Sequence, residues 1–474
     1  MNPAILLIFV CKGSYFYEDI HKFYNIFLCI YAFIRIFAND MHVNGPMKWI
    51  AVYVLTLLTC TIYAQHPKDD IKQNIRRSAN SLMAYPGPQQ HKLTPAPQGK
   101  QPFFISHYGR YGSHHLLQKE DYDAPYQALI EADKAGKLTA KGQNVKLRIE
   151  KIRDDAYEEL GELTPTGARQ QQLIAQRMVE RFPEVFIDKA VVDARSTTVT
   201  RCILSMEHFL IQLTRMKPNL KIRHNATHRD MYFLNQQDRK LMMARMDSAT
   251  QEQYNKFSKR YSKFDRLLRT LFNDMTYVTQ HVDAKKLNDD LFYLASNMQN
   301  TELRQKMTLY DIFSDQDIYC NWMKENAWWY INYGACTLNG STQPYSQRNL
   351  LRRIINDADS CLTLKRPSVQ LRFGHDVVLL SLACLMDINH WGLATNRLGK
   401  LGENGWSCYR IIPMAANIQL IFYRDNPDDK DVWIKVLYNE DEATLPLPGD
   451  HAPYYRWADF RSYYLKKLDD YEKH

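Results

Sequence analysis

Apolar runs bounded by polar, glycine-containing segments recur along the chain and predict strands. Residues 103–106 (FFIS), 190–194 (AVVDA) and 368–373 (SVQLRF) are short, apolar and followed by polar loops, as expected of buried strands. Residues 417–423 and 432–438 predict two further strands. In open α/β sheets ligands bind at the carboxyl ends of strands, so the loops after the first three runs are candidate site loops.

Apolar residues at helical spacing predict helices between these strands. Helices are expected over 163–181, 199–213 and 377–386, each next to a strand-like run. Residues 228–356 lack strand alternation and predict a mostly helical insertion. The pattern therefore predicts an α/β domain that carries a mostly helical inserted domain.

Residues 47–64 have the pattern of an export signal. Lys48 precedes an apolar run from Trp49 to Cys60, and the small residue Ala64 precedes a polar one. The run is shorter than the roughly 20 residues of a comfortable membrane span. Cleavage after Ala64 is predicted, which makes the mature protein periplasmic or secreted.

Two alternatives stay open at this end of the chain. Lipid attachment at Cys60 would anchor the protein to a membrane, although residues 57–59 (LLT) lack the expected small residue. Residues 1–46 are either a probable upstream extension, with translation starting at Met41 or Met47, or a marginal extra membrane segment. The later start is favoured.

The rest of the chain divides by composition. Residues 65–102 end in a proline-rich polar stretch and predict an extended leader, with the fold proper beginning after it. The first part of the α/β domain is then expected at 103–227, the helical insertion at 228–356 and the second part at 357–474.

Composition excludes several classes of protein. The 474 residues are 45% hydrophobic and 24% charged, with only 18 Gly and 19 Pro, which excludes a disordered or collagen-like chain. The net charge of +9 is mild and long basic runs are absent, so no nucleic-acid partner is expected. His224 and His228 lack a glutamate between them, which makes a zinc-protease site a weak candidate, and no metal or cofactor is expected.

The cysteines leave the redox state open. Six lie beyond residue 64, namely Cys202, Cys320, Cys336, Cys361, Cys384 and Cys408. An even number in an exported protein permits disulfides, but no C-x-x-C pair occurs. Cys202 and Cys384 lie in apolar helical patterns, where buried free thiols are at least as expected.

Arginines, histidines and a carboxylate follow the three strand-like runs. These are Arg110 with the loop through His114, then Arg195, and then His375 with Asp376. Guanidinium groups bind phosphate oxygens bidentately, and a carboxyl group can protonate a leaving alcohol. Each residue alone is more often a surface ion-pair partner or a helix cap. Together they predict phosphate chemistry.

Five segments carry a resemblance to a known family. They are ISHYGRYGSHHLL (105–117), LTPTGARQ (163–170), ARSTTVTRC (194–202), LRFGHD (371–376) and PMAANIQLIFYR (413–424). Together they resemble the histidine acid phosphatases, in particular the branch with multiple inositol polyphosphate phosphatases and phytases. The resemblance implies a phosphoglycerate-mutase-like α/β sandwich with a helical inserted domain. It also implies hydrolysis of small phosphomonoesters, inositol polyphosphates among them.

The resemblance further implies roles for the residues that match. By position Arg110 is the first phosphate clamp and Arg195 the later one. His375 is then the phosphate-binding histidine and Asp376 the proton donor.

Two positions depart from the family motif Arg-His-Gly-x-Arg. Tyr111 stands in the place of the histidine nucleophile, and His114 stands in the place of the second arginine clamp. With an unperturbed pKa of about 10, only about one phenol in a thousand is ionised at pH 7. A phosphotyrosine intermediate would also be an ordinary aryl ester that turns over slowly. Hydrolysis is therefore expected to be impaired.

Neighbouring histidines offer limited compensation. His107, His114 and His115 are close enough in sequence to be considered as replacement nucleophiles, but in-line attack demands a near-attack geometry. Protonated His114 is expected to add a cation, so phosphate affinity should strengthen as the pH falls toward 5.

Three hypotheses follow for the function. The chain is an exported phosphomonoester hydrolase with impaired activity, or a pseudophosphatase that binds phosphorylated ligands without turnover. The third is a decaying gene or a sequence error, since each of the two substitutions needs one nucleotide change.

Overall fold

The computed structural model describes residues 66–449 and 451–473. These residues belong to two compact units, of which one comprises residues 70–401 and 406–474 and holds the elements discussed below except the first residues of α4 (Pro67–Gln73). The predicted signal at 47–64, the upstream extension at 1–46 and Cys60 lie outside the described residues.

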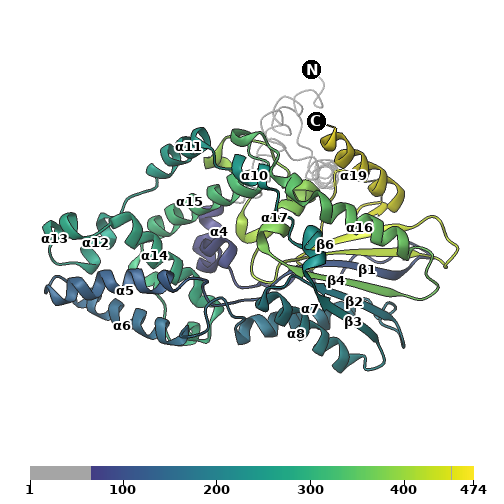
Figure 1. Cartoon of the computed structure of the whole chain (residues 1–474), viewed down its shortest axis with the longest axis horizontal. Coiled ribbons are helices and arrows are strands. Elements are labelled where there is room, and N and C mark those ends of the chain that lie inside the picture. Colours follow the sequence, from purple (N-terminus) through teal and green to yellow (C-terminus); the bar gives the residue numbers. More distant parts are fainter. Residues whose placement is uncertain (1–65, 450, 474) are drawn as a thin grey trace, which may run out of the picture. The chain divides into compact units, whose positions relative to one another are not determined.

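One mixed sheet forms the core of this unit (Figure 1). In chain order its eight strands are β1 (Gln101–Arg110), β2 (Val191–Ser196), β3 (Lys221–Ala226), β4 (Ser368–Gly374), β5 (Asn417–Arg424), β6 (Trp433–Tyr438), β7 (Asp441–Glu442) and β8 (Tyr454–Arg456). The order in space is β3–β2–β4–β1–β5–β6–β7, and β8 pairs with β6. Strands β3, β2, β4 and β1 are parallel, and β5 and β6 continue the sheet antiparallel. The carboxyl ends of β1, β2 and β4 therefore meet at one edge.

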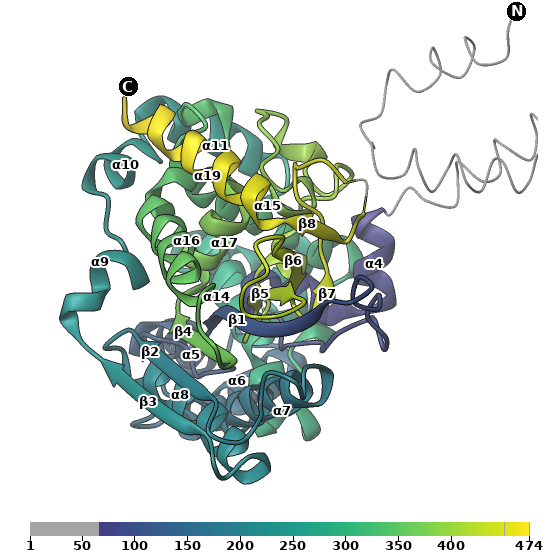
Figure 2. The ribbon, with the colours of Figure 1, turned by 90° about the vertical axis from the view of Figure 1, so that its right-hand side faces the viewer.

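Helices cover both faces of the sheet (Figure 2). On one face lie α7 (Pro165–Arg181) and α8 (Thr200–Met216), and on the other lie α16 (Arg348–Cys361), α17 (Asp376–Leu385) and α19 (Trp457–Glu472). Neighbouring residues of β1 serve the two faces in turn, because Phe104 belongs to one buried cluster and Ile105 to the other. The predicted α/β architecture with a helical part is confirmed.

Residues 228–356 are helical, as the sequence predicts. The helices are α9 (Met231–Leu234), α10 (Arg239–Ala244), α11 (Ser248–Lys259), α12 (Asp265–Leu271), α13 (Met275–His281), α14 (Ala284–Asn297), α15 (Asp315–Tyr333) and the start of α16. Two further helices, α5 (Lys119–Lys134) and α6 (Ala140–Asp155), pack against α14 and α12. The helical part is therefore built from two segments of the chain, and one of them lies within the range 103–227 expected for the α/β domain.

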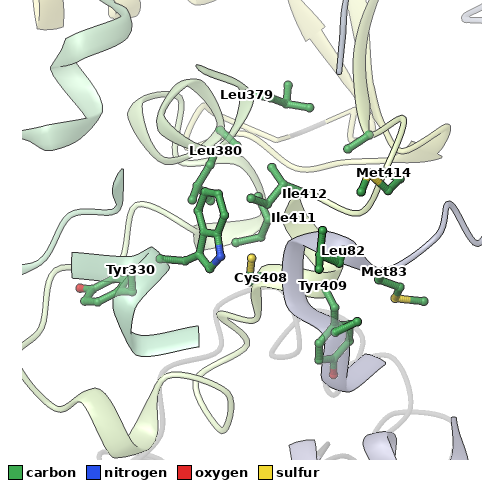
Figure 3. Packing of buried hydrophobic residues seen from close by; sticks show 14 of the residues in the cluster. Leu82, Met83, Tyr330, Leu379, Leu380, Cys408, Tyr409, Ile411, Ile412 and Met414 are labelled. Atoms are coloured by element: carbon green, nitrogen blue, oxygen red, sulfur yellow. The ribbon is translucent and has the colours of Figure 1, made fainter. Parts of the chain in front are cut away.

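The fold begins before residue 103, which corrects the expectation of a leader through 102. Helix α4 (Pro67–Gln73) leads into the 3-10 helix η2 (Ile75–Leu82), whose residues from Ser78 onward are buried. Leu82 and Met83 belong to the same buried cluster as Cys408 and Met414 (Figure 3). The proline-rich stretch is extended, as predicted, but Gln89 N–H donates to Asp441 and Thr94 N–H to Glu442. Burial and hydrogen bonding make this segment part of the domain.

Strand β3 and helix α19 are further elements that the sequence analysis did not predict. Strand β3 lies at the edge of the sheet and is polar and mostly exposed, so no apolar alternation marks it. Helix α19 packs on α16 near the end of the chain. In the described part of the chain all six cysteines are free, and Cys202 and Cys384 are buried. None of the helices described combines the length and the hydropathy that a transmembrane span requires.

Candidate active site

The candidate site forms where β1 and β4 end side by side. Arg110 is the last residue of β1 and lies in register with Gly374, the last residue of β4. The N–H of Tyr111 donates to the carbonyl of Gly374 at 3.2 Å. His375 and Asp376 follow directly, and Asp376 is the first residue of α17. The sheet register therefore brings Arg110, Tyr111, His375 and Asp376 together, as the sequence predicts.

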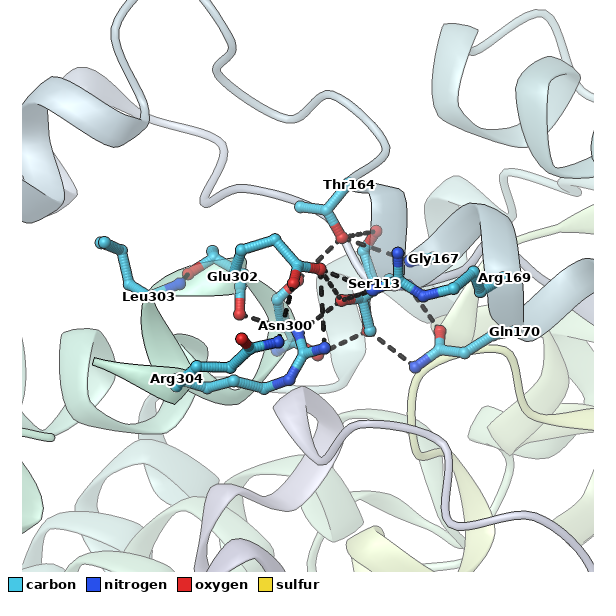
Figure 4. A network of polar contacts seen from close by, with 12 residues as sticks. Ser113, Thr164, Gly167, Arg169, Gln170, Asn300, Glu302, Leu303 and Arg304 are labelled. Carbon is cyan, nitrogen blue, oxygen red and sulfur yellow. Dashed lines mark hydrogen bonds and ion pairs between the residues drawn. The ribbon is translucent and has the colours of Figure 1, made fainter. Parts of the chain in front are cut away.

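Close backbone packing explains the glycine after Tyr111. A Cβ atom on Gly112 would lie 2.5 Å from the carbonyl oxygen of Gly167, and one on Gly167 would lie 2.2 Å from that of Ser113. Ser113 then ties the loop to the helical part (Figure 4), since its Oγ donates to Asn300 Oδ1 at 2.7 Å and accepts from Gln170 Nε2 at 2.9 Å. The loop that carries Tyr111 is held on both sides.

Arg110 is almost fully buried, with 1% of its surface exposed. Its Nη1 donates to the carbonyls of Ser81 and Ile412, each at 2.6 Å. Its Nη2 lies 2.9 Å from Asp376 Oδ2. The guanidinium group is thus engaged by the protein itself, and η2 supplies one of its partners.

Tyr111 and Asp376 interact directly. The Tyr111 hydroxyl donates to Asp376 Oδ2 at 3.1 Å, and only 4% of Tyr111 is exposed. Burial and then the charge of Asp376 raise the pKa of the Tyr111 phenol. Burial alone would raise the pKa of Asp376, but Arg110 and His375 outweigh it and hold that pKa below its usual value. At neutral pH the pair is a neutral phenol and a carboxylate.

The Tyr111 ring lies at the centre of the site. The guanidinium carbon of Arg201 is 4.5 Å from the ring centroid and that of Arg110 is 5.0 Å from it. The rings of His114 and His375 meet it edge-on at 5.0 and 5.7 Å. Two cations and two imidazoles therefore surround one phenol.

The histidines of the site are neutral. Burial, followed by the charges of Arg201 and Arg110, lowers the pKa of His114 to about 3. Its Nδ1 lies 2.5 Å from the carbonyl of His115, so this nitrogen carries the proton and donates. Burial lowers the pKa of His375 to about 4. The expectation that His114 becomes a cation near pH 5 is therefore wrong for this site as it stands.

The other two candidate histidines lie in structural positions. His107 packs its ring against Phe209 and Phe373, at 5.6 and 5.4 Å between centroids. His115 Nε2 lies 3.2 Å from Glu159. Neither ring stacks on Tyr111, and a structural role fits both.

Arg195 is not among the residues that the structure brings together. It lies within β2 rather than in the loop after it, and alternates with the buried Ala194 and Ser196. Its guanidinium group pairs with Asp193 at 3.1 Å and with Asp230 at 2.7 Å. These two carboxylates hold it on the strand.

Arg201 is the cation that the sequence analysis missed. It lies in the first turn of α8, where its guanidinium group covers the Tyr111 ring and its buried Nε has no hydrogen-bond partner. Cys202 follows it, with Sγ 4.0 Å from His375 Nε2. The available signal was its place in the first turn of the helix predicted at 199–213, because that turn sits at the carboxyl edge of the sheet.

Comparisons with known proteins agree with this fold. The model of the histidine phosphatase superfamily, branch 2, matches residues 119–439, a range that begins after the Tyr111 loop. The chain is 24% identical to multiple inositol polyphosphate phosphatase 1 of Gallus gallus over 333 residues, which are 66% of this chain and 71% of that protein.

Two solved structures resemble the chain in fold. The multiple inositol polyphosphate phosphatase of Bifidobacterium longum, in complex with inositol hexasulfate, has a TM-score of 0.69 at 17% identity, covering 81% of this chain and 97% of that one. The phytase from D. castellii has a TM-score of 0.65 at 13% identity, covering 83% and 86%. With the matching family model, these findings show that the chain belongs to the histidine phosphatase superfamily, branch 2.

Proposed function

We propose that the chain is a phosphomonoester hydrolase of the histidine acid phosphatase type whose hydrolysis is strongly impaired. Its ligand class is small phosphomonoesters, with inositol polyphosphates as the first candidates. The observation that carries the proposal is Tyr111, a buried phenol in the place of the histidine nucleophile that donates its proton to Asp376.

Tyr111 and Asp376 disable each other for catalysis. A nucleophile must reach the phosphorus as an anion or lone pair, but the raised pKa of Tyr111 keeps its hydroxyl protonated. A proton donor must hold a proton, but the lowered pKa of Asp376 keeps it ionised. Because the hydroxyl of one group satisfies the carboxylate of the other, both are removed from the reaction.

Phosphate binding is less damaged than turnover. Arg201 has no carboxylate partner among the described residues, its Nε lacks a hydrogen bond, and it lies in the first turn of the long helix α8. An arginine fork at a helix N-terminus is a favourable place for a phosphate group. Arg201 is therefore our candidate for the main phosphate contact, whereas the family resemblance gave the clamp roles to Arg110 and Arg195.

A pseudophosphatase is the second candidate, and Arg201 favours it, because its Nε has no hydrogen-bond partner and it lies in the first turn of α8. The Tyr111 ring limits this binding, since the guanidinium groups of Arg110 and Arg201 both lie against it and an approaching phosphate group must displace it. We expect the native protein to bind phosphate more weakly than a variant with a smaller residue at position 111.

One set of variants tests the proposed function. We would assay phytate and a generic aryl phosphate at pH 4–7 with the native protein, Tyr111→Phe, Tyr111→His, and Tyr111→His combined with His114→Arg. Loss of a nucleophile costs on the order of a millionfold in a well-studied hydrolase, so the double variant should be at least about a hundredfold faster than the native protein. Tyr463→His, at an exposed tyrosine of α19, is the matched control.

The outcomes separate the hypotheses. A native rate equal to that of the double variant would contradict the role given to Tyr111, and a loss of residual hydrolysis in Tyr111→Phe would make the phenol the nucleophile. An inactive double variant would indicate decay beyond the motif.

We also propose that the protein is exported, on the signal-like pattern of residues 47–64. Sequencing the amino terminus of the mature protein from the periplasm or medium should give a chain that begins at Gln65. A start at Cys60 would indicate a lipoprotein instead.

A further inference from the structure

We propose that Arg245, held beside Tyr333, forms a second anion position next to the Tyr111 site and selects ligands that carry at least two phosphate groups. The proposal rests on the proposed function, because it assumes that a first phosphate group binds near Arg201. It assigns a role to a residue of the helical part.

The backbone fixes the place of Arg245. The residue follows α10, and its N–H donates to the carbonyl of Leu241 at 3.1 Å. Its own carbonyl accepts from Asn339 Nδ2 at 2.9 Å. Helices α10, α15 and α17 all pack against the short helix η8 (Gln343–Gln347), so α10 lies near the site helix α17 (Figure 1). Arg245 is therefore held on a defined part of the structure.

Tyr333 connects Arg245 to the site. The guanidinium carbon of Arg245 lies 5.1 Å from the centroid of the Tyr333 ring, at the end of α15. The Tyr333 carbonyl accepts from Ser381 Oγ at 3.1 Å, and Ser381 lies on α17, which begins at Asp376. Burial raises the pKa of Tyr333, and the charges of Arg245 and Asp376 then act on it in opposite directions. Tyr333 thus lies close enough to both Arg245 and Asp376 for their charges to act on it.

The Tyr333 ring is itself held in place. It packs against Trp329 at 5.4 Å and Trp328 at 6.1 Å between centroids. Trp329 Nε1 donates to Glu325 at 3.3 Å, which orients that indole. A ring packed against two indoles gives the guanidinium group beside it a defined position, since arginine stacks favourably on aromatic faces.

Arg245 lacks the acidic partner that other arginines of the helical part have. Arg348 pairs with Asp238 at 2.7 Å and Arg353 with Asp357 at 2.8 Å. Among the described residues no carboxylate lies within ion-pair distance of Arg245, although its side chain is half-buried. A partly desolvated cation without a protein anion favours an anion from outside, and its planar fork suits a phosphate group.

The geometry therefore favours a compact polyphosphate over a monophosphate. A ligand that places one phosphate group near Arg201 and another toward Arg245 gains from both cations, whereas a monophosphate gains from one. A small ring with several phosphate groups has this chemistry, and its rigidity limits the entropy lost on binding.

Titration calorimetry with two probes tests the inference. We would measure inositol hexakisphosphate and inorganic phosphate binding to the native protein, Arg245→Gln, Arg245→Lys and Arg260→Gln at pH 6. Arg260 is an exposed arginine at the end of α11 and serves as the control. Arg245→Gln should weaken binding of the hexakisphosphate about tenfold and change inorganic phosphate less than about twofold. Arg245→Lys should recover part of the loss, and Arg260→Gln should change neither.

The other outcomes distinguish a failure of the Arg245 proposal from a failure of the proposed function. Equal losses for both probes, or no loss for the hexakisphosphate, would overturn the role of Arg245 and leave the proposed function standing. If inorganic phosphate does not bind but the hexakisphosphate binds and depends on Arg245, the first phosphate position fails and Arg245 stands as the main contact. If the native protein binds neither probe, both proposals are wrong.

Discussion

Two neighbouring regions of the site, the end of β1 and the start of α8, hold their arginines in opposite ways. Where β1 and β4 end, Arg110 donates to two backbone carbonyls and pairs with Asp376. At the start of α8, Arg201 lies on the face of Tyr111 and pairs with no carboxylate among the described residues. One guanidinium group is engaged by oxygen atoms of the protein, and the other lies against an aromatic ring.

The difference teaches that a motif arginine need not be the residue that binds the ligand. Arg110 occupies the motif position, yet its contacts link η2, α18 (Cys408–Ile411) and α17. A buried charge with three partners is costly to remove because the partners lose their compensation. We therefore expect Arg110 to act mainly on stability and Arg201 mainly on binding.

The largest expected effect is on stability. Arg110→Met leaves Asp376 and two carbonyls without their donor, so the free energy of unfolding should fall by about 3–5 kcal/mol. Arg201→Met removes a stacked cation without an acid partner and should cost about 1 kcal/mol or less. Urea unfolding at pH 7 measures both. Equal losses of unfolding free energy in the two variants would contradict the distinction between Arg110 and Arg201.

The next effect concerns His107 of β1, which packs against Phe209 of α8 and Phe373 of β4. Burial, followed by the charge of Arg372, lowers its pKa to about 3. The unfolded chain takes up a proton below pH 6.5 and the folded one does not, so stability falls as the pH falls from 6.5 toward 3. Between pH 6.5 and pH 5 this histidine should cost about 2 kcal/mol.

Unfolding at pH 7 and pH 5 checks this expectation. In His107→Met the loss of stability between the two pH values should shrink by about 2 kcal/mol. His91→Met, at an exposed histidine, is the control. An unchanged pH dependence in His107→Met would mean that the buried ring carries a proton at pH 5.

The smallest of the three effects is on ligand affinity. Arg201→Met should weaken binding of inorganic phosphate about tenfold, or about 1.4 kcal/mol, because it removes the available guanidinium fork. Arg215→Met changes an exposed arginine near the far end of the same helix and should leave binding unchanged. Unaltered affinity in Arg201→Met would place the phosphate group elsewhere and contradict the binding role given to Arg201.

Much of the architecture followed from local pattern. The runs at 368–373, 417–423 and 432–438 are strands, and the helices expected over 163–181 and 199–213 are present with small shifts at their ends. These elements bury an apolar face, and burial leaves a periodic signal in the sequence.

Elements without such a signal escaped prediction. Strand β3 is a polar edge strand, and the segment around η2 is buried by contacts with residues that lie hundreds of positions away, Trp322 and Met414 among them. Neither β3 nor η2 shows a local alternation of apolar residues. Long-range packing decides both.

The sequence by itself determined the fold family, through its motifs, and the two strand ends that carry Arg110 with Tyr111 and His375 with Asp376. Both pairs lie where an apolar strand ends, which is a local signal. Only the tertiary structure decided which second arginine reaches the ring. Arg195 and Arg201 lie six positions apart, but strand alternation turns one toward Asp230 and the first turn of α8 carries the other to Tyr111. Burial likewise made His114 neutral and Tyr111 a proton donor to Asp376, since desolvation depends on neighbours that no local pattern reveals.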